Sequence, residues 1–424
     1  MRIGVIGAGA TGLAAAVKLS ESHEVTVFEK GGLGGLAGAA ALHGTEIDRF
    51  YHHIFTSDEH IIRLIDGCGL GANMLWKPAK NGLYMDSRLY PFTNPVDLLL
   101  FPKVSLVGRL RMGLTVLGAK KVRDFRELET VSAREWIIKK SGQSAYEAMW
   151  APLLYSKFGE DSDSVSGVWI WNKFKLRGSS RQGINNEYLG YLRGGFIALY
   201  EKMAESLDVR YEPVTRIKRE SGKILLETGG RAEAFDRVLF TAAAGLLGGL
   251  CDFPAEYRER LLAQKHKANI CMTLVLRKPV SDYYWITVAD RNAPFVLMIE
   301  HTNLFDDPAY CGDKVVYLSR YLDAGDPMFA AGDGEIRETF LGYLGRMFPA
   351  FSEKDIIDCY VNREAYAQPV VYQRHSERIL PFETPVEGLY LANMGQIYPE
   401  DRGQNYAVKL GLDAARIMDG GDSE

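Results

Sequence analysis

Three glycines near the amino terminus have the spacing of a turn that binds a dinucleotide. In the stretch VIGAGATGLAAA they are Gly7, Gly9 and Gly12, and the apolar run RIGVI at residues 2–6 comes directly before them. In such a turn the first glycine permits a tight bend, the second lets the backbone approach a pyrophosphate, and the third allows close packing of helix on strand. Free N–H groups and the positive dipole end of that helix would hold the phosphates. A glycine turn without any ligand is the alternative.

A carboxylate and a second glycine pair follow at distances that suit the same ligand. Glu29 ends the apolar run EVTVF at residues 24–28, about 20 residues after the glycines, where a carboxylate accepts hydrogen bonds from ribose hydroxyls. The same carboxylate would repel a 2′-phosphate, which disfavours NADP. Gly34 and Gly35 come next and would let another backbone segment run close to the dinucleotide.

Two adjacent histidines, His52 and His53, lie in the segment FYHHIFTSDEH at residues 50–60. Adjacent imidazoles could ligate a metal, shuttle protons or form the wall of a cofactor pocket. Neighbouring residues on an extended chain point to opposite faces, and no third cluster of ligands accompanies the pair, so the sequence argues against a metal site. We expect His53 to shape a pocket wall and His52 to pack elsewhere. Proton transfer by His53 and a plain core histidine stay open.

The composition is that of a globular protein with no marked charge. The 424 residues include 47% hydrophobic and 25% charged side chains, and the formal net charge of −4 argues against a general nucleic-acid binder. Five scattered cysteines without a CxxC pair are typical of free thiols in a reducing cytoplasm. The amino terminus lacks a signal-peptide pattern, and no apolar run approaches the roughly 20 residues of a membrane-spanning helix. The sequence thus predicts a cytoplasmic protein.

Residues 94–124 leave a contact with a membrane surface open. This stretch is rich in leucine and valine, and its basic residues include Lys103, Arg109, Arg111, Lys120 and Lys121. A helix that lies at the membrane interface has this composition, and so does a core helix with a basic exposed face. We therefore expect either a peripheral contact at the inner face of the membrane or an ordinary packed helix.

The order of predicted elements indicates an α/β fold. A strand at 2–6, a helix at 13–19 and a strand at 24–28 form a βαβ unit with a parallel sheet. Further along, the pattern predicts strands at 37–42 and 45–49 about the turn His43-Gly44, mostly helices from 95 to 155 with starts at Thr130-Val131-Ser132 and Ser141, a loop at 173–194, a helix at 196–207, strands within 209–242, an antiparallel sheet within 265–325, a strand at 388–392 and a helix at 406–418.

The glycine fingerprint, the acidic residue and the double glycine together resemble the amino-terminal motif of a flavoprotein superfamily. It contains amine oxidases, phytoene desaturases, protoporphyrinogen oxidases and UDP-galactopyranose mutases. The stretches VRYEPVTRI and GLYLANMGQIYPEDRGQNYAVKLG extend the resemblance. It implies non-covalent FAD in a Rossmann-like domain of the glutathione-reductase type, with the Val214 backbone at the adenine. Gly403-Gln404-Asn405 would open the last helix and turn its amino-terminal amides toward the pyrimidine end of the flavin.

The predicted cofactor-binding residues come from these motifs. They are Gly7, Gly9, Ala10, Thr11, Gly12, Glu29, Lys30, Gly34, Gly35, Leu36, His53, Val214, Asn393, Arg402, Gln404 and Asn405. Residues 1–78, 195–245 and 385–424 are predicted to form the discontinuous FAD-binding domain. Residues 79–194 would be a mainly helical substrate region, and residues 246–384 a substrate region built on an antiparallel sheet.

A longer and weaker similarity links the chain to UDP-galactopyranose mutase. His53-Ile54-Phe55 is similar to a flavin-proximal loop of that family, and the stretches AYEAMWAPLLYSKFGEDSDSV, IEHTNLF and KVVYLSRYL extend the match. By this resemblance, arginines would hold a sugar-nucleotide diphosphate; solvated surface arginines are the alternative. The catalytic candidates are His53, Arg177, Arg320 and Tyr398, with Arg181 beside Arg177 in the loop KLRGSSRQG.

These resemblances leave two reaction classes. An FAD-dependent oxidoreductase would pass a hydride from its substrate to flavin N5, whereas a mutase-like enzyme would use reduced N5 as a nucleophile without net redox change. The chain departs from the mutases at Phe158, where they carry tryptophan, and in IYPEDRG, where they carry a tyrosine-rich signature. These departures favour an oxidoreductase that acts on a small molecule, either a nucleotide sugar or a lipophilic compound. A flavin-stabilised binding protein is the third alternative.

Overall fold

The glycine turn lies inside a βαβ unit. The computed structural model describes residues 1–42, 45–179, 181–182 and 186–421, without the side chains of 176–179, 181, 182 and 186. β1 (Arg2–Ile6) and β2 (Glu24–Phe28) pair in parallel and have the predicted bounds. α1 (Ala10–Ser20) connects them and begins three residues before the predicted helix, because the turn leads straight into it with Gly9 as N-cap.

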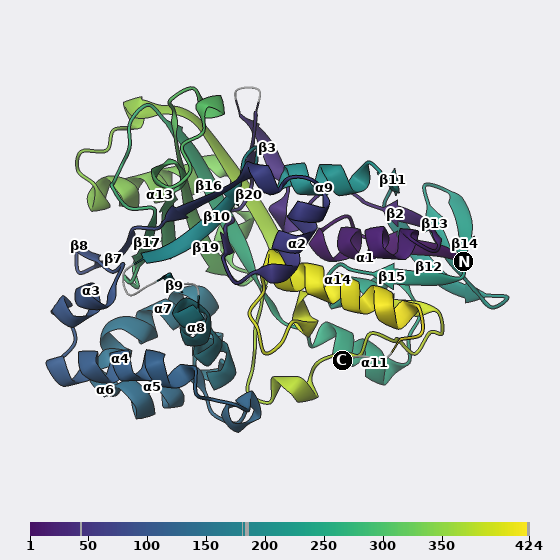
Figure 1. Ribbon diagram of the computed structural model, residues 1–424, viewed down its shortest axis with the longest axis horizontal. Helices are drawn as coiled ribbons and strands as arrows, with labels where there is room; N and C mark the ends of the chain where they lie inside the picture. Colours follow the sequence, from purple (N-terminus) through teal and green to yellow (C-terminus); the bar gives the residue numbers. More distant parts are fainter. Residues whose placement is uncertain (43–44, 180, 183–185, 422–424) are drawn as a thin grey trace.

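Five parallel strands form the sheet around this unit. Their order is β11-β2-β1-β15-β21, with β11 (Asp208–Arg210), β15 (Arg237–Phe240) and β21 (Leu389–Leu391). The strands come from three segments far apart in the sequence, and Figure 1 shows the purple, teal and yellow parts of the chain gathered at one end of the molecule. The predicted α/β fold with a Rossmann-like domain is confirmed.

Different elements cover the two faces of the parallel sheet. Ile3 and Val5 belong to the core shared with α1, against which α9 (Ile197–Ala204) and α14 (Gln404–Met418) pack. Ile6 and Phe28 belong to a second core, shared with a three-stranded antiparallel sheet. The strands of that sheet are β12 (Val214–Glu220), β13 (Lys223–Thr228) and β14 (Arg231–Phe235).

The helices α1 and α14 cross at close range. Gly411 of α14 faces the Thr11 carbonyl of α1, where an added Cβ would lie 2.3 Å from the oxygen. α14 begins two residues before the predicted helix and ends at the predicted residue. The carboxy-terminal helix is therefore fixed directly against the helix that the glycine turn opens.

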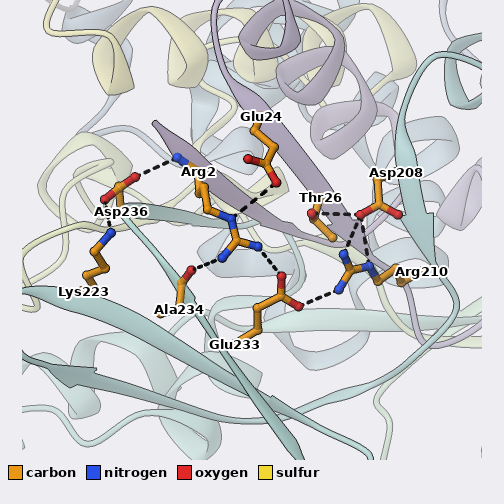
Figure 2. A network of polar contacts seen from close by, with 9 residues as sticks. All are labelled: Arg2, Glu24, Thr26, Asp208, Arg210, Lys223, Glu233, Ala234 and Asp236. Atoms are coloured by element: carbon orange, nitrogen blue, oxygen red, sulfur yellow. Dashed lines mark hydrogen bonds and ion pairs between the residues drawn. The ribbon is translucent and has the colours of Figure 1, made fainter.

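A network of charged side chains joins β1, β2 and β11 of the parallel sheet to β14 (Figure 2). Arg2 pairs with Glu24 and Glu233, and Arg210 pairs with Glu233 and Asp208. Arg2 and Glu24 begin β1 and β2, at the edge opposite the carboxyl ends where ligands of such sheets bind, whereas Arg210 ends β11. The network fixes β14 to the sheet through Glu233.

The predicted antiparallel sheet is present and is larger than its pattern indicates. Seven strands lie in the order β20-β16-β19-β18-β17-β7-β8, and all neighbours are antiparallel except β17 and β7. The bounds are β7 (Asn81–Met85), β8 (Arg88–Pro91), β16 (His266–Leu276), β17 (Trp285–Val288), β18 (Leu297–Glu300), β19 (Lys314–Leu322) and β20 (Ile356–Pro369). α13 (Asp333–Met347) packs on one face through Ile336, Phe340 and Leu344. The sheet thus joins residues 79–194 to residues 246–384.

Helices dominate residues 95–179. They are α3 (Pro95–Leu100), α4 (Leu106–Ala119), α5 (Ala133–Ser141), α6 (Gln143–Ala145), α7 (Ala151–Phe158) and α8 (Gly167–Ser179), with a π-helical turn at Tyr146–Trp150. Ser132 caps α5 as predicted, because its side chain accepts from the Glu135 amide at 3.1 Å. The second predicted start is wrong: Ser141 ends α5, and Gly142, with φ of 96°, interrupts the chain before α6.

The loop predicted at residues 173–194 is also wrong. α8 continues to Ser179, and β9 (Arg181–Gln182) and β10 (Asn186–Leu192) follow. β10 pairs antiparallel with β5 (Ile54–Phe55) and β6 (Met74–Pro78). Its Gly190 makes room for the Trp76 ring, which an added Cβ would approach to 2.6 Å. The strand is hidden in the sequence because its partners lie far away along the chain.

Shorter elements complete the fold. β3 (Ala39–Leu42) and β4 (Thr45–Asp48) form the predicted hairpin, whose turn at His43-Gly44 lies outside the described residues. The remaining helices are α2 (Glu59–Gly67), α10 (Ala244–Leu250), α11 (Ala255–Leu262) and α12 (Pro327–Ala330). In the part of the chain that the structure describes, no helix has the length and hydropathy needed to span a bilayer.

Candidate functional site

The glycine turn is shaped so that two of its positions accept only glycine. Gly7 has φ of 108°, and a Cβ there would lie 2.5 Å from Thr241 Oγ1. A Cβ on Gly12 would lie 1.9 Å from the Gly7 carbonyl oxygen. The nearest heavy atom to a Cβ on Gly9 would be Gly35 Cα, at 3.9 Å. The turn thus keeps its backbone bare at the point where α1 begins.

The double glycine runs beside this turn. The Gly34 amide donates to the Ala8 carbonyl at 2.9 Å, and Gly9 and Gly34 form a parallel bridge. Gly34 and Gly35 both have positive φ, 86° and 58°. Two bare backbone segments therefore meet beyond the carboxyl ends of β1 and β2, as a dinucleotide requires.

Glu29 joins the two loops. Its Oε2 accepts from the Ala8 amide and its Oε1 from the Gly31 amide, each at 2.8 Å. Each oxygen keeps a lone pair, so the carboxylate can still accept from ribose hydroxyls. The Glu29 amide donates to the Arg210 carbonyl, which places the strand leading toward Val214 beside it.

Arg49 is a cation at the double glycine that the sequence does not reveal. Its Nη2 donates to the Gly35 carbonyl at 3.0 Å, and its buried Nε has no hydrogen-bond partner among the described residues. A guanidinium donor next to two bare loops suits a pyrophosphate oxygen. No motif marks Arg49, because only the hairpin β3–β4 brings it back to Gly35. Of the other predicted loop residues, Lys30 is exposed and Leu36 half-buried.

Two side-chain amides of the carboxy-terminal segment offer buried donors. Asn393 follows β21, and its side-chain oxygen accepts from the Gly395 amide at 2.8 Å, while its Nδ2 has no partner in the described chain. Gln404 is arranged likewise: Oε1 accepts from the Tyr200 hydroxyl at 2.6 Å, and Nε2 has no described partner. Unpaired amide donors of this kind fit a ligand rich in acceptors, such as an isoalloxazine.

Asn405, the next residue of α14, is used differently. Its Oδ1 accepts from the amides of His60 and Ile61 at 2.9 and 3.2 Å. These amides lie in the first turn of α2, where a helix leaves its N–H groups without partners. Asn405 therefore caps α2, and cofactor binding through its side chain stays a prediction.

The two histidines have different surroundings. His53 Nδ1 lies 3.0 Å from the Tyr284 hydroxyl, and its ring packs edge-on against Trp285. Burial, together with the charge of Arg402, lowers the pKa of His52 to about 4, so His52 is neutral at physiological pH. In the described ranges no group of three His, Cys, Asp or Glu side chains could hold a metal ion.

Arg402 connects the histidine segment to the carboxy-terminal segment. Its Nη2 donates to the Tyr321 hydroxyl at 2.6 Å and its Nε to Gln368 Oε1 at 2.8 Å. The Tyr321 hydroxyl in turn lies 3.1 Å from that of Tyr51, the neighbour of His52. The two segments predicted to border the flavin therefore meet at one place, with β19 between them.

A group of cations around Asp401 adjoins Arg402. Asp401 pairs with Lys173 and accepts from Trp169 Nε1 at 3.0 Å, and Lys157 Nζ lies 4.9 Å from the Trp169 ring centre. Burial lowers the pKa of Lys157 well below its usual value. Burial opposes the ionisation of Asp401 too, but the surrounding cations hold the pKa of that carboxyl far below its ordinary range. We call Lys157, Lys173, Arg402 and Asp401 the cationic cluster.

The cationic cluster holds three basic groups against one acid, so it favours an anion. Sequence reasoning misses Lys157 and Lys173, because they come from α7 and α8 and meet Asp401 only in the folded chain. The apolar frames around them, LLYSKF and VWIWNKF, are typical of ordinary helices. A lysine inside such a buried apolar stretch is the signal that could have found them.

Arg320 and Tyr398, both predicted to be catalytic, make their contacts outside the cationic cluster. Arg320 precedes Tyr321 on β19 and so points to the opposite face of the sheet, where it donates to the Pro294 carbonyl at 3.3 Å. Tyr398 donates its hydroxyl to Glu129 at 2.7 Å. The structure thus does not bring these two side chains together with the cluster, and their catalytic roles stay predictions.

Arg177 and Arg181 are placed only by their backbone. Arg177 lies in the last part of α8 and Arg181 in β9. Their side chains fall outside what the structure describes. Contact of either arginine with a substrate therefore stays a prediction as well.

A family comparison agrees with this geometry. The sequence model of one protein family, the flavin containing amine oxidoreductases, matches residues 10–418. The chain belongs to this family. Membership makes the cofactor FAD, and the two bare loops, Glu29 and the unpaired amide donors fit that group.

Curated relatives match part of their own length. The chain is 26% identical over 202 residues to a zeta-carotene desaturase of Arabidopsis thaliana, an alignment that covers 42% of this chain and 36% of that one. It is 28% identical over 228 residues to protoporphyrinogen oxidase 2 of the same plant, with 51% of this chain and 42% of that one covered. The chain thus aligns with less than half the length of each.

Solved structures of two enzymes share the fold. A variant of putrescine oxidase superposes with a TM-score of 0.77 at 16% identity, over 99% of both chains. Reduced UDP-galactopyranose mutase superposes with a TM-score of 0.77 at 14% identity, over 100% of this chain and 96% of that one. The amine oxidase-like fold therefore extends along the whole chain.

Proposed function

We propose that the protein is an FAD-dependent oxidoreductase that takes a hydride from a small-molecule substrate. The observation that carries this proposal is the pair of bare glycine loops bridged by Glu29, inside a chain that the family model covers from residue 10 to residue 418. When bound, FAD supplies the two-electron redox chemistry. The residues of the chain would bind and orient FAD and the substrate and would exclude water from the site.

The adenine and pyrophosphate ends would be held by the loops. The amides at the start of α1, together with the Arg49 guanidinium, would bind the pyrophosphate, and Glu29 the ribose. Val214 at the start of β12 would lie at the adenine. Asn393 and Gln404 would donate to the flavin ring from the carboxyl edge of β21 and the first turn of α14. We propose a non-covalent complex.

The cationic cluster would bind an anionic group of the substrate. Among the side chains that the structure describes, Lys157 has ring contacts but no carboxylate within ion-pair distance. An incoming carboxylate or phosphate would raise the depressed pKa of Lys157 toward its usual range and so gain a charge-assisted hydrogen bond there, which offsets the cost of the anion's own desolvation. His53, with Tyr284 and Trp285 around it, would form an adjacent pocket wall. A nucleotide sugar and a lipophilic compound with an acidic end would both suit this combination of basic and aromatic side chains.

Lys157 gives this part of the proposal its test. Replacing Lys157 with Met should raise the KM of an anionic substrate about tenfold or more with a smaller change in kcat, because a charge-assisted bond is lost in the ground state and the transition state alike. Lys175→Met is the matched control, since Lys175 is an exposed residue of α8 whose Nζ lies 4.9 Å from the Trp171 ring centre. Equal effects of the two variants would refute a substrate-binding role for Lys157.

Anaerobic titration tests the reaction class. An oxidoreductase bleaches its flavin stoichiometrically when its substrate is added and needs no prior reduction. The mutase-like alternative, which the cationic cluster also suits through a diphosphate, predicts turnover of a sugar nucleotide only after dithionite reduction and without an acceptor. Candidate amines, polyenes and sugar nucleotides would be tested in both states. Turnover confined to the reduced enzyme would replace our proposal with the mutase.

A further inference from the structure

The helices α3 and α4 carry most of the exposed large apolar side chains of the described chain. Eight of the fourteen such residues lie on these two helices. They are Val96, Leu99, Leu100, Leu106, Val107, Leu110, Leu114 and Leu117, and we call them the apolar stripe. Leu100 is 72% exposed, and Val107 and Leu114 are each 67% exposed. An apolar surface of this extent marks a contact with a partner or a membrane.

α4 is apolar on two sides. Gly108, Met112, Thr115 and Ala119 recur at helical spacing and are buried against the rest of the helical region. The stripe residues of α4 follow the same spacing on the side that faces outward. A surface helix of a globular protein normally carries polar residues there. Apart from Arg109 and Arg111, the outward side of α4 therefore carries apolar side chains and glycine where an ordinary surface helix carries polar residues.

The ends of the two helices have partners within the chain. Asn94 and Asp97 form a capping box at the start of α3, and Ser105 caps α4. Arg109 donates to the Leu99 carbonyl at 2.5 Å, near the end of α3. Backbone groups satisfied in this way depend less on water, which suits a place at the boundary of an apolar phase.

The segment that carries the stripe is positively charged, although one of its cations, Lys103, pairs with Asp86 outside the segment. Residues 94–124 contain six basic and two acidic side chains, a net charge of +4 in a chain whose net charge is −4. Arg109 and Arg111 donate to backbone carbonyls, which leaves their charge without a neutralising acid in these bonds. Lys120, Lys121 and Arg123 are exposed beyond the end of α4. Such a rim attracts an anionic surface.

We propose that the apolar stripe docks the protein on an anionic lipid bilayer, with the leucines in the interface and the basic rim at the headgroups. A second copy of the chain is a poorer occupant, because a two-fold interface would bring the two +4 segments together. A protein partner is less favoured as well: interface cores are enriched in aromatic residues and methionine, whereas the exposed apolar residues of the stripe are all Leu and Val.

Docking would place the helical region on the bilayer. Figure 1 shows α3 and α4 at the end of the molecule away from α1 and the amino terminus. α4 packs against α8, which carries Trp169 and Lys173 of the candidate site. α8 therefore lies between the helix that would contact the bilayer and the cationic cluster.

Vesicle flotation of the flavin-loaded protein tests the proposal. We expect the wild type to float with phosphatidylcholine vesicles that contain phosphatidylglycerol, and to float less in high salt or without the anionic lipid. The double variant Val107→Glu/Leu114→Glu should reduce the vesicle-bound fraction about tenfold or more, because both side chains lose the burial that drives interfacial binding. Leu262→Glu is the control, since Leu262 is 63% exposed on α11, outside the stripe.

The outcomes separate the alternatives. Unchanged flavin content and Tm of the variants would show that they fold. Three results would each overturn the proposal: a wild type that does not float, a double variant that floats as well as the wild type, or a Leu262→Glu control that loses as much vesicle binding as the double variant. Light scattering distinguishes a second copy: a dimer that the double variant dissociates, with no vesicle binding by the wild type, would assign the stripe to self-association. The result is independent of which substrate bleaches the flavin.

Discussion

Glu29 holds together the two loops that would enclose the cofactor, because its oxygens accept from Ala8 and from Gly31. Glu29→Ala removes these bonds and the ones that we propose to a ribose. We expect FAD to bind about ten- to a hundredfold more weakly, in line with the loss of charge-assisted hydrogen bonds. The ratio of flavin to protein absorbance in the purified protein measures this. Glu21→Ala, which removes an exposed pair with Lys18, should keep its flavin; full occupancy in Glu29→Ala would contradict the ribose role.

Asp48 makes a prediction about pH. It is buried at the end of β4, and burial raises its pKa from 3.8 to about 8. The folded protein thus keeps a proton that the unfolded chain releases, so stability falls as pH rises between these two values, by at most about 1.4 kcal/mol per pH unit, and levels off above the upper one.

Asp48→Asn removes this titration. Its free energy of unfolding should fall less steeply than that of the wild type as pH rises through the window. Denaturant unfolding of both proteins at several pH values checks this. Burial also raises the pKa of Glu300, to about 7, but Glu300 is present in both proteins. The difference between their two stability curves therefore reports Asp48 alone. Parallel curves for the two proteins would show that Asp48 does not carry the effect.

At the residue scale, the sequence is sufficient where the chemistry is local. Gly7, Gly9, Gly12, Glu29 and the double glycine lie within one short stretch, and the structure brings them together as their spacing predicts. Arg49, Lys157 and Lys173 could not be predicted in this way, because the hairpin and the helix packing that position them are formed by contacts distant in sequence. Arg320 shows the converse: its type suits a diphosphate, but strand alternation turns it away from Tyr321.

At the scale of elements, the close crossing of α1 and α14 requires a residue without a side chain, Gly411, at the point of contact. Gly411→Ala would put a Cβ 2.3 Å from the Thr11 carbonyl oxygen and force the helices apart. We expect a loss of about 1–3 kcal/mol of stability and weaker FAD binding, because α1 opens at the glycine turn. Thermal unfolding and flavin titration measure both effects.

Gly342→Ala in α13 is the matched control for that substitution. No described heavy atom outside the helix's own backbone lies within 4 Å of a Cβ there, so alanine should stabilise the helix by about 0.5–1 kcal/mol. A Gly411→Ala variant as stable as the Gly342→Ala variant would show that α1 and α14 can separate without cost.

The elements with strong local patterns are the ones that the sequence predicts best. β1 and β2 have the expected bounds, and Ser132 and Glu135 form the capping box that marks the start of α5. The loop expected at 173–194 is instead helix and strand, since β10 owes its existence to pairing with β5 and β6. Pairing between strands distant in sequence gives no local sequence pattern. Gly190 suggests a loop, but it lies within β10 and makes room for the Trp76 ring.

At the scale of the whole molecule, FAD should act as a structural component, since the residues predicted to bind it come from three distant parts of the chain. Removing the flavin is expected to lower Tm, and adding FAD at about a hundred times its Kd should restore about 2.7 kcal/mol of stability. Differential scanning fluorimetry of stripped and reloaded protein measures this. A Tm that does not depend on added FAD would argue against binding by the folded state.

The three-part origin of the parallel sheet also has a consequence during synthesis. While the ribosome is still adding residues before β21, the edge of β15 has no neighbour and α1 has no α14 against it. Such an open strand edge is prone to aggregation, so the nascent chain should need chaperones until its last segment emerges. Proteins shortened from the carboxy terminus, even by little more than α14, should accumulate as colourless inclusion bodies.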